Sequence, residues 1–293
     1  MSHPGIEAIR GFLGAEPDDP DKDLLTRRAD LAALTGSQPA PDGVLVEPLE
    51  FDGIRAERLT PPLAPDGQCI VYLHGGGYCL GSIDGHRGLA GALAVAARTT
   101  VVNVDYRLAP EDPFPCALDD VLEVFDELSP ARIALAGDSA GGGLSLAAAV
   151  ALRDRGRAQP QALGLLSPWT DLTQSAPTYA EVGERDPMVT KALLDQMADA
   201  YCNGHDPREP MVSPLFAELA GLPPMRIDVG TEELLLDDSR VLAERAAAAG
   251  VDVELEVWPE MIHVFQAFPA SILPEAATSI ERIGRFLADR LAP

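Results

Sequence analysis

One pentapeptide constrains the fold more than any other stretch of this chain. Gly137-Asp138-Ser139-Ala140-Gly141 fits the pattern G-x-S-x-G. It follows the apolar run RIALA and opens the run AGGGLSLAAAVAL, so a predicted buried strand passes here into a predicted helix. The flanking glycines remove Cβ atoms that would clash in so sharp a turn. A strand, a tight turn and a helix in this order predict that the Ser139 hydroxyl stands clear of the sheet as a nucleophile.

Strand-like and helix-like segments alternate along the rest of the chain. The strand candidates are residues 43–52, 54–61, 69–76, 99–106, 131–139, 162–169, 225–233 and 251–261, and the main helix candidates are 5–14, 23–34, 88–98, 140–156, 190–204, 239–250 and 279–291. This alternation predicts an α/β fold with a mainly parallel sheet covered by helices on both faces. The first two strands predict an antiparallel pair at a sheet edge. We expect one domain over residues 1–293, with a small helical cap formed by about residues 1–42 and about 175–210.

The charge of the chain excludes several kinds of partner. The formal net charge is −24, and lysine occurs only at positions 22 and 191. An acidic surface repels phosphates, so neither a nucleic acid nor an anionic membrane is expected as a partner. The N-terminus lacks the basic and apolar regions of a signal peptide, no stretch is long enough to span a bilayer, and the four cysteines form no CxxC pair. These features favour a cytoplasmic location.

A second glycine-rich motif lies at the end of the strand candidate 69–76. His74-Gly75-Gly76-Gly77 lets the main chain approach a ligand closely. Acyl transfer passes through a tetrahedral oxyanion, which main-chain N–H groups stabilise when they point at it. The residue after the nucleophile, Ala140, offers another such N–H group. The two motifs together predict an oxyanion hole next to Ser139.

The motifs HGGG, YRLAPE (106–111) and GDSAGG (137–142) stand in the order and spacing typical of one enzyme family. From about residue 70 onward, the chain resembles the hormone-sensitive lipase family of α/β-hydrolases, the bacterial HGGG esterases. The resemblance implies hydrolysis of carboxylic esters by a Ser-acid-His triad without metal or cofactor, with Gly76, Gly77 and Ala140 as the oxyanion hole. It also implies that His74 holds the glycine loop, that Arg107 and Glu111 tie loops together, and that a homodimer forms through the sheet edge.

The base and the acid of the triad should follow Ser139 in the order acid, then histidine. Of the five histidines, only His263 follows every acid candidate, and the sequence MIHVF resembles the family's H-G-F site with valine in place of glycine. The acid candidates are Glu232, Glu233, Asp237 and Asp238. The family pattern places the acid at Glu233, where aspartate is usual, and a glutamate can do the same work. Asp237 remains the runner-up and Glu232 a lesser alternative, because an aspartate at a helix start has a capping role, which we expect for Asp238.

The substrate pocket is less clearly encoded. Trp169 and Leu172 follow the strand after the nucleophile helix, and Met188 lies in the expected cap, so these three are candidate substrate contacts. Phe12, Met197 and Tyr201 are further candidates for the cap lining. We expect a carboxylesterase that acts on small soluble esters with short to medium acyl chains. The alternatives are a non-catalytic ligand receptor on the same fold, like the plant gibberellin receptor that lacks the triad histidine, and a lipase or acyltransferase.

Overall fold

One sheet of eight strands organises the computed structural model, which describes residues 3–13, 19, 22–36, 39–128 and 131–292. The strands are β1 (Leu45–Phe51), β2 (Ile54–Thr60), β3 (Gln68–Leu73), β4 (Val101–Val104), β5 (Arg132–Asp138), β6 (Leu163–Leu166), β7 (Met225–Gly230) and β8 (Val253–Trp258). Their order is β1-β2-β4-β3-β5-β6-β7-β8. The pairs β1–β2 and β2–β4 are antiparallel and the others are parallel. The predicted α/β class and the antiparallel edge pair are therefore confirmed.

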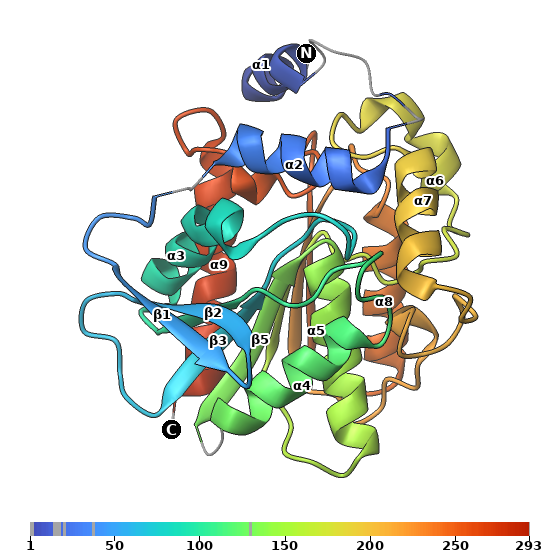
Figure 1. The fold of residues 1–293 in the computed structure, drawn as a ribbon. Coiled ribbons are helices and arrows are strands. Elements are labelled where there is room, and N and C mark those ends of the chain that lie inside the picture. The colour runs from blue at the N-terminus through green and yellow to red at the C-terminus, as the bar shows by residue number, and fades with distance from the viewer. Residues whose placement is uncertain (1–2, 14–18, 20–21, 37–38, 129–130, 293) are drawn as a thin grey trace.

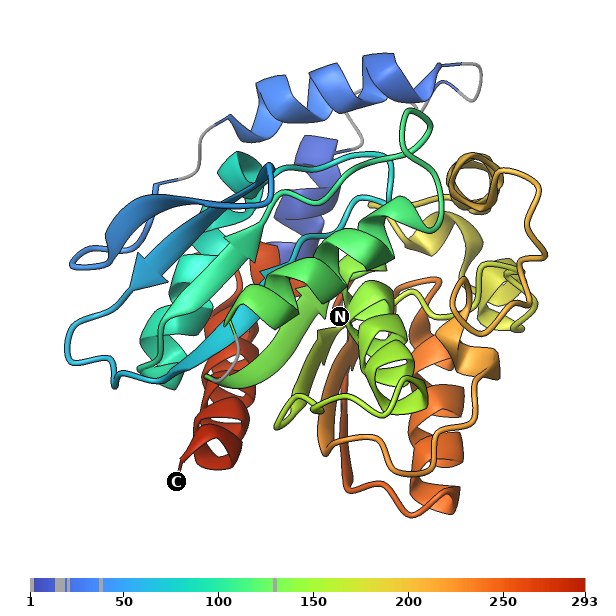
Figure 2. The same cartoon turned by 60° about the horizontal axis from the view of Figure 1, so that its bottom comes forward.

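Helices cover both faces of this sheet (Figures 1 and 2). They are α1 (Pro4–Leu13), α2 (Leu24–Thr35), α3 (Ile83–Ala97), α4 (Cys116–Leu128), α5 (Ala140–Asp154), α6 (Thr178–Glu181), α7 (Lys191–Cys202), α8 (Leu236–Ala248) and α9 (Pro274–Leu291). Single 3-10 turns lie at Gly183–Arg185, Pro214–Phe216 and Phe265–Ala267. Helices α3 and α9 share one apolar cluster with the sheet, whereas α4, α5 and α8 share the other. No helix in the described ranges is long and apolar enough to cross a membrane.

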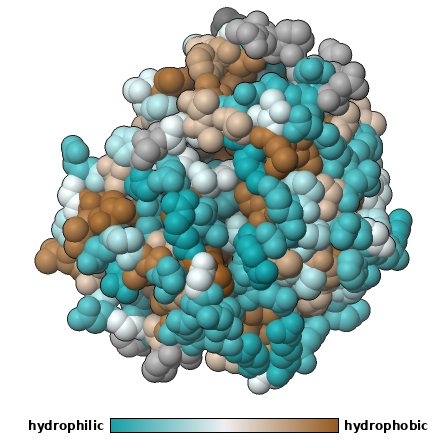
Figure 3. All heavy atoms as spheres, in the orientation of Figure 1, coloured by the Kyte–Doolittle hydropathy of each residue, from teal (hydrophilic) through white to brown (hydrophobic). Residues whose placement is uncertain are grey.

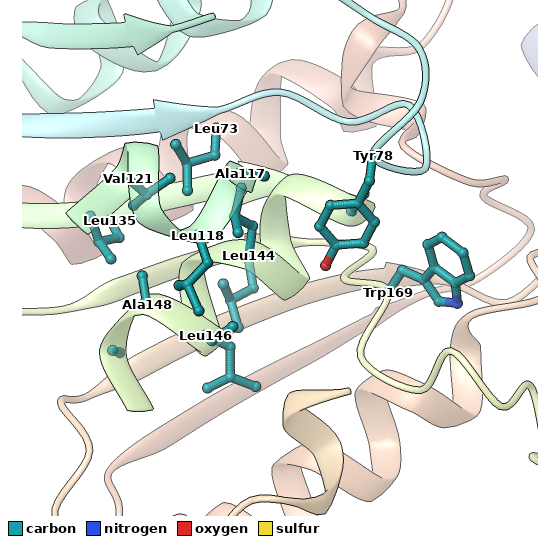
Figure 4. Packing of buried hydrophobic residues seen from close by; sticks show 14 of the residues in the cluster. Leu73, Tyr78, Ala117, Leu118, Val121, Leu135, Leu144, Leu146, Ala148 and Trp169 are labelled. Atoms are coloured by element: carbon teal, nitrogen blue, oxygen red, sulfur yellow. The ribbon is translucent and has the colours of Figure 1, made fainter. Parts of the chain in front are cut away.

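The larger apolar cluster packs the nucleophile helix α5 against both the sheet and α4. Leu144 and Leu146 of α5 are fully buried, and Leu118 and Val121 of α4 belong to the same cluster (Figure 4). Burial of each such leucine contributes about 1.5–3 kcal/mol. Helix α4 lies outside the helices expected from the sequence, although its buried residues recur at helical spacing. The start of α5, which carries the active-site turn, therefore rests on a well-packed base.

A separate layer of helices lies beyond the carboxyl ends of the parallel strands. Helix α2 crosses this edge, and α6 and α7 lie beside it (Figure 1). Arg28 of α2 donates hydrogen bonds to the carbonyls of Cys79 and Ala109 and forms an ion pair with Glu111 at 2.7 Å. Arg107 pairs in turn with the buried Asp120 of α4. Arg107 and Glu111 thus each fix the YRLAPE loop to a helix, Arg107 to α4 and Glu111 to α2, rather than joining two loops.

Helix α1 lies on the same side of the molecule but packs against a different loop (Figure 1). Its residues Ile6 and Ile9 are buried in a small cluster with Trp258, Met261 and Phe265, at the loop between β8 and α9. The expected cap residue Phe12 on the same helix is 65% exposed, and it contacts solvent instead of a substrate cavity. The face of the molecule seen in Figure 3 is largely hydrophilic, in keeping with the acidic composition.

Candidate active site

The turn between β5 and α5 has the backbone that the G-x-S-x-G pattern predicts. Ser139 has φ 52° and ψ −121°, a strained conformation for a residue with a side chain. A Cβ atom on Gly141 would lie 1.9 Å from the carbonyl oxygen of Leu73, and one on Gly137 would lie 2.5 Å from the carbonyl carbon of Gly141. Only glycine fits these two positions, so the sequence requirement has a direct steric cause. The serine hydroxyl is thereby presented at the carboxyl edge of the sheet.

His263 lies between this serine and one of the four candidate acids. Its Nε2 is 3.0 Å from Ser139 Oγ, and its Nδ1 is 3.2 Å from Glu233 Oε1. Glu233 is fully buried and His263 is nearly so. The three side chains come from the ends of β5, β7 and β8, which are brought together because carboxyl ends of parallel strands meet at one edge. The structure thus joins Ser139, Glu233 and His263 in one hydrogen-bonded row.

The second oxygen of Glu233 is held by two donors. The Ser167 hydroxyl and the Gly230 main-chain N–H each donate to Oε2 at 2.8 Å. Ser167 Oγ also accepts the N–H of Val264 at 3.2 Å, so one serine contacts both the acid loop and the histidine loop. Sequence reasoning missed Ser167, although its position one residue past β6, at the same sheet edge, is a signal that could have found it.

The other three acids have separate environments. Asp237 is half-buried and lies 3.4 Å from Arg240, and Glu232 lies 3.4 Å from Arg185. Asp238 is fully buried and is not a helix cap, contrary to the expectation. Its carboxylate accepts the N–H groups of Thr170 and Asp171 and the hydroxyl of Tyr179, which it reaches because α8 packs against the loop after β6.

Electrostatics around the imidazole favour its charged form. Burial opposes the charge, but the hydrogen bond and charge of Glu233, with the charges of Asp186 and Asp138, outweigh it and raise the pKa of His263. For the buried His74, burial and the neighbouring His86 lower the pKa to about 3. The two histidines therefore differ in protonation: His263 can gain a proton near neutral pH, whereas His74 stays neutral.

The glycine loop at residues 75–77 is fixed by a buried carboxylate, that of Asp138. The Gly75 N–H and the Tyr72 hydroxyl both donate to Asp138 Oδ1, at 3.1 and 2.6 Å. His74 is buried, with Nδ1 2.8 Å from the Gly75 carbonyl and its ring stacked on Tyr106. No residue in the described part of the chain accepts a hydrogen bond from the main-chain N–H of Gly76 or Gly77. These N–H groups remain available to an oxyanion, together with the N–H of Ala140 at the start of α5.

Comparisons with known proteins agree with this geometry. A family model described as the alpha/beta hydrolase fold matches residues 70–267. An acetyl-hydrolase of Streptomyces hygroscopicus is 44% identical over 231 residues, which cover 77% of each chain. The carboxylesterase NlhH of Mycobacterium tuberculosis is 40% identical over 244 residues, 78% of this chain and 75% of the relative. A crystal structure of an esterase from the bacterial hormone-sensitive lipase family superposes with a TM-score of 0.93 at 42% identity, over 100% of both chains.

The chain belongs to the hormone-sensitive lipase family of α/β-hydrolases. It is a carboxylesterase of that family.

In this esterase, a cavity of about 1090 Å³ opens at the serine. Its lining residues include Ser139, His263, Gly76 and Gly77, and the apolar ones include Leu31, Leu34, Leu89, Met188, Leu193 and Met197. Met188 and Met197, two candidates for the cap lining, are thus among the lining residues.

Trp169 and Leu172 do not line this cavity and correct the expectation that they border the acyl pocket. Both are buried in the large apolar cluster, and the Trp169 ring lies 6.0 Å from that of Tyr78 (Figure 4). Tyr201, a further candidate for the cap lining, is also absent from the cavity wall; its ring is buried and stacks on that of Tyr78 at 3.9 Å. The main-chain N–H groups of Thr170 and Asp171 donate to the Asp238 carboxylate, which fixes the loop after β6. In this loop, the side chains of Trp169 and Leu172 point into the core.

Proposed function

We propose that this carboxylesterase hydrolyses esters with short to medium acyl chains through an acyl-enzyme on Ser139. The row from Ser139 through His263 to Glu233, with separations of 3.0 and 3.2 Å, is the observation that carries the proposal. A nucleophile, a base and an orienting carboxylate within hydrogen-bonding distance are the components of a Ser-His-acid triad.

The proposed cycle has two halves. His263 Nε2 takes the Ser139 proton while Oγ attacks the ester carbonyl carbon, and the N–H groups of Gly76, Gly77 and Ala140 receive the oxyanion. The imidazolium then gives its proton to the leaving alcohol oxygen, and the acyl-enzyme remains. Water attacks this acyl-enzyme with His263 again as the base, which releases the acid and restores the serine. Glu233 keeps the proton on Nδ1, so that Nε2 is free to accept.

The cavity supports the proposed substrate class. Its volume of about 1090 Å³ is slightly above the usual range for small-ligand pockets, roughly 300–1,000 Å³, so an acyl chain has room in it. Apolar side chains from α2, α3 and α7 line it, which suits an uncharged acyl chain. The strongly negative net charge disfavours anionic esters.

We further propose that residues from about 1–42 and about 175–210 form a cap on a single domain, that the chain dimerises through its sheet edge, and that it is cytoplasmic. Helices α2 and α7 supply lining residues to the cavity, which supports the first proposal. The exposed Leu255 on the edge strand β8 supports the second.

Turnover of p-nitrophenyl esters from acetate to decanoate tests the proposed function. We expect a maximum of kcat/KM among the short and medium chains and loss of turnover in Ser139→Ala. Ser145→Ala is the matched control, because Ser145 donates only to the Gly141 carbonyl within the same helix. A folded wild type that binds esters without turnover would favour the receptor alternative, and product formation that follows added alcohol would favour acyl transfer.

A further inference from the structure

One buried carboxylate near the site has no part in the cycle just described. Asp186 follows the 3-10 turn Gly183–Arg185, in the segment between α6 and α7, and is 4% exposed. Within the described residues, no lysine or arginine forms an ion pair with it, and the adjacent Arg185 pairs with Glu232 instead. A buried, unpaired carboxylate is costly, so its hydrogen bonds and its neighbours must account for it.

The hydrogen bonds of Asp186 connect two parts of the active site. Its Oδ2 accepts the main-chain N–H of Leu234 at 3.0 Å, and Leu234 is the residue directly after Glu233. Its Oδ1 accepts the N–H groups of Met188 at 2.9 Å and of Val189 at 3.3 Å, two residues that line the cavity. One carboxylate thus fixes the acid loop of the core against the cavity wall of the cap segment.

The charge of Asp186 acts on the histidine. Burial raises the pKa of Asp186 to about 6, and the charge of His263 opposes that rise. Reciprocally, the negative charge of Asp186 helps to raise the pKa of His263. The other ionisable groups that face this imidazole are Glu233 and Asp138, and Asp138 Oδ2 lies 3.8 Å from His86.

We propose that Asp186 is a positioning residue of the esterase, which holds the main chain beside Glu233 and adds a further negative charge near His263. The inference rests on the proposed function of the triad. Its chemical consequence is that Asp186 stabilises the imidazolium formed during each proton transfer, in addition to Glu233 and Asp138. Its geometric consequence is that the acid loop keeps its place only while the segment at Met188 is docked.

The pH profile of Asp186→Asn tests the proposal. Asparagine keeps one oxygen for the N–H groups of Met188 and Val189 but turns its NH2 group toward the Leu234 N–H, and it removes the charge. Loss of the charge should move the acid limb of kcat/KM, the fall in kcat/KM as His263 gains a proton, to lower pH by about 0.5 or more. The plateau should fall by about tenfold, because the imidazolium loses part of its stabilisation. Asp186→Glu should restore the acid limb toward that of the wild type. Asp237→Asn is the matched control, the same chemical change at a half-buried carboxylate beside Arg240, and should leave the limb in place.

An acid limb that stays in place in folded Asp186→Asn overturns the proposal, even where the plateau falls, because a purely structural role reduces activity without moving the limb. Circular dichroism checks the fold, and Asp186→Ser replaces a variant that does not fold, with the same expected shift. NMR titration of the His263 imidazole in wild type and variant makes the same comparison without turnover. The two failures can therefore be told apart. An inactive wild type would contradict the proposed function, whereas an unchanged pKa of the His263 imidazole in Asp186→Asn would contradict this inference.

Discussion

Replacing Glu233 by glutamine tests which group orients the imidazole, because the structure determines how the amide must sit. Two donors, the Ser167 hydroxyl and the Gly230 N–H, point at Oε2, whereas only Nδ1 of His263 faces Oε1. The amide oxygen should therefore occupy the Oε2 position, and the NH2 group should face Nδ1. An NH2 group can only donate, so it selects the imidazole tautomer with its proton on Nε2. That tautomer cannot accept the proton of Ser139.

The size of the activity loss in Glu233→Gln depends on whether the glutamine amide can turn over. Turning the amide over would leave the fixed Gly230 N–H facing an NH2 group in a buried site, at a cost of about 1–3 kcal/mol. The unproductive orientation therefore dominates, and the carboxylate charge that stabilises imidazolium is lost as well. In triads of this kind, the equivalent acid-to-amide change lowers kcat by about 10⁴, or roughly 5.5 kcal/mol of activation free energy. We expect a loss between about 10³ and 10⁴ in Glu233→Gln.

The assay is kcat/KM for p-nitrophenyl butyrate at pH 8, with the unfolding temperature measured alongside. Glu232→Gln is the matched control, because its carboxylate faces Arg185 at 3.4 Å and not the imidazole. It should stay within about threefold of the wild type, the range of a surface substitution. If Glu233→Gln keeps more than a tenth of the activity, or if Asp237→Asn loses as much, Glu233 does not orient the histidine.

Three further predictions concern the same region. Because its surroundings raise the pKa of His263, the acid limb of wild-type kcat/KM should have its midpoint above 6.5, and a midpoint below 6 would contradict this. Val264 has φ 48° with a branched side chain, so Val264→Gly should change the free energy of unfolding in urea by less than about 1 kcal/mol, relief of strain offsetting lost packing, whereas a loss above 2 kcal/mol would mean that the backbone is unstrained. Burial raises the pKa of Asp238 to about 7, and a group with a raised folded-state pKa stabilises the fold at low pH and loses that contribution as pH rises through 7. The stability of wild type relative to Asp238→Asn should therefore fall by a few kcal/mol between pH 4 and pH 8, at about 1.4 kcal/mol per pKa unit, and an unchanged difference would refute it.

Much of the fold follows from local patterns in the sequence. The buried strands are continuous apolar runs, and the turn at Ser139 requires glycines on both sides, so the motif and the fold predict each other. Chain order and family resemblance together predict the row of Ser139, Glu233 and His263. The glutamate is placed where aspartate is usual, and its longer arm is held by Ser167 and Gly230.

The missed features depend on contacts between distant segments. Asp238 has the local context of a helix cap, yet it lies in the core because the loop after β6 offers it two main-chain N–H groups. Trp169 follows a strand that ends beside the nucleophile, but the direction of its side chain is decided by packing on Tyr78. Asp186 is one acid among many in an acidic chain, and only its 3.0 Å hydrogen bond to Leu234 distinguishes it.

The placement of the two lysines affects how this enzyme can be attached to a solid support. Lys22 lies just before α2 and lines the cavity, and Lys191 is the first residue of α7. Their side chains are 36% and 48% exposed. Coupling through the lysine amines would therefore attach the molecule to the support beside the cavity. It would also tie the residue before α2 and the start of α7 to the same support. Coupling through the abundant surface carboxylates would spread attachment over the whole molecule, so that a smaller share of the links would fall beside the cavity.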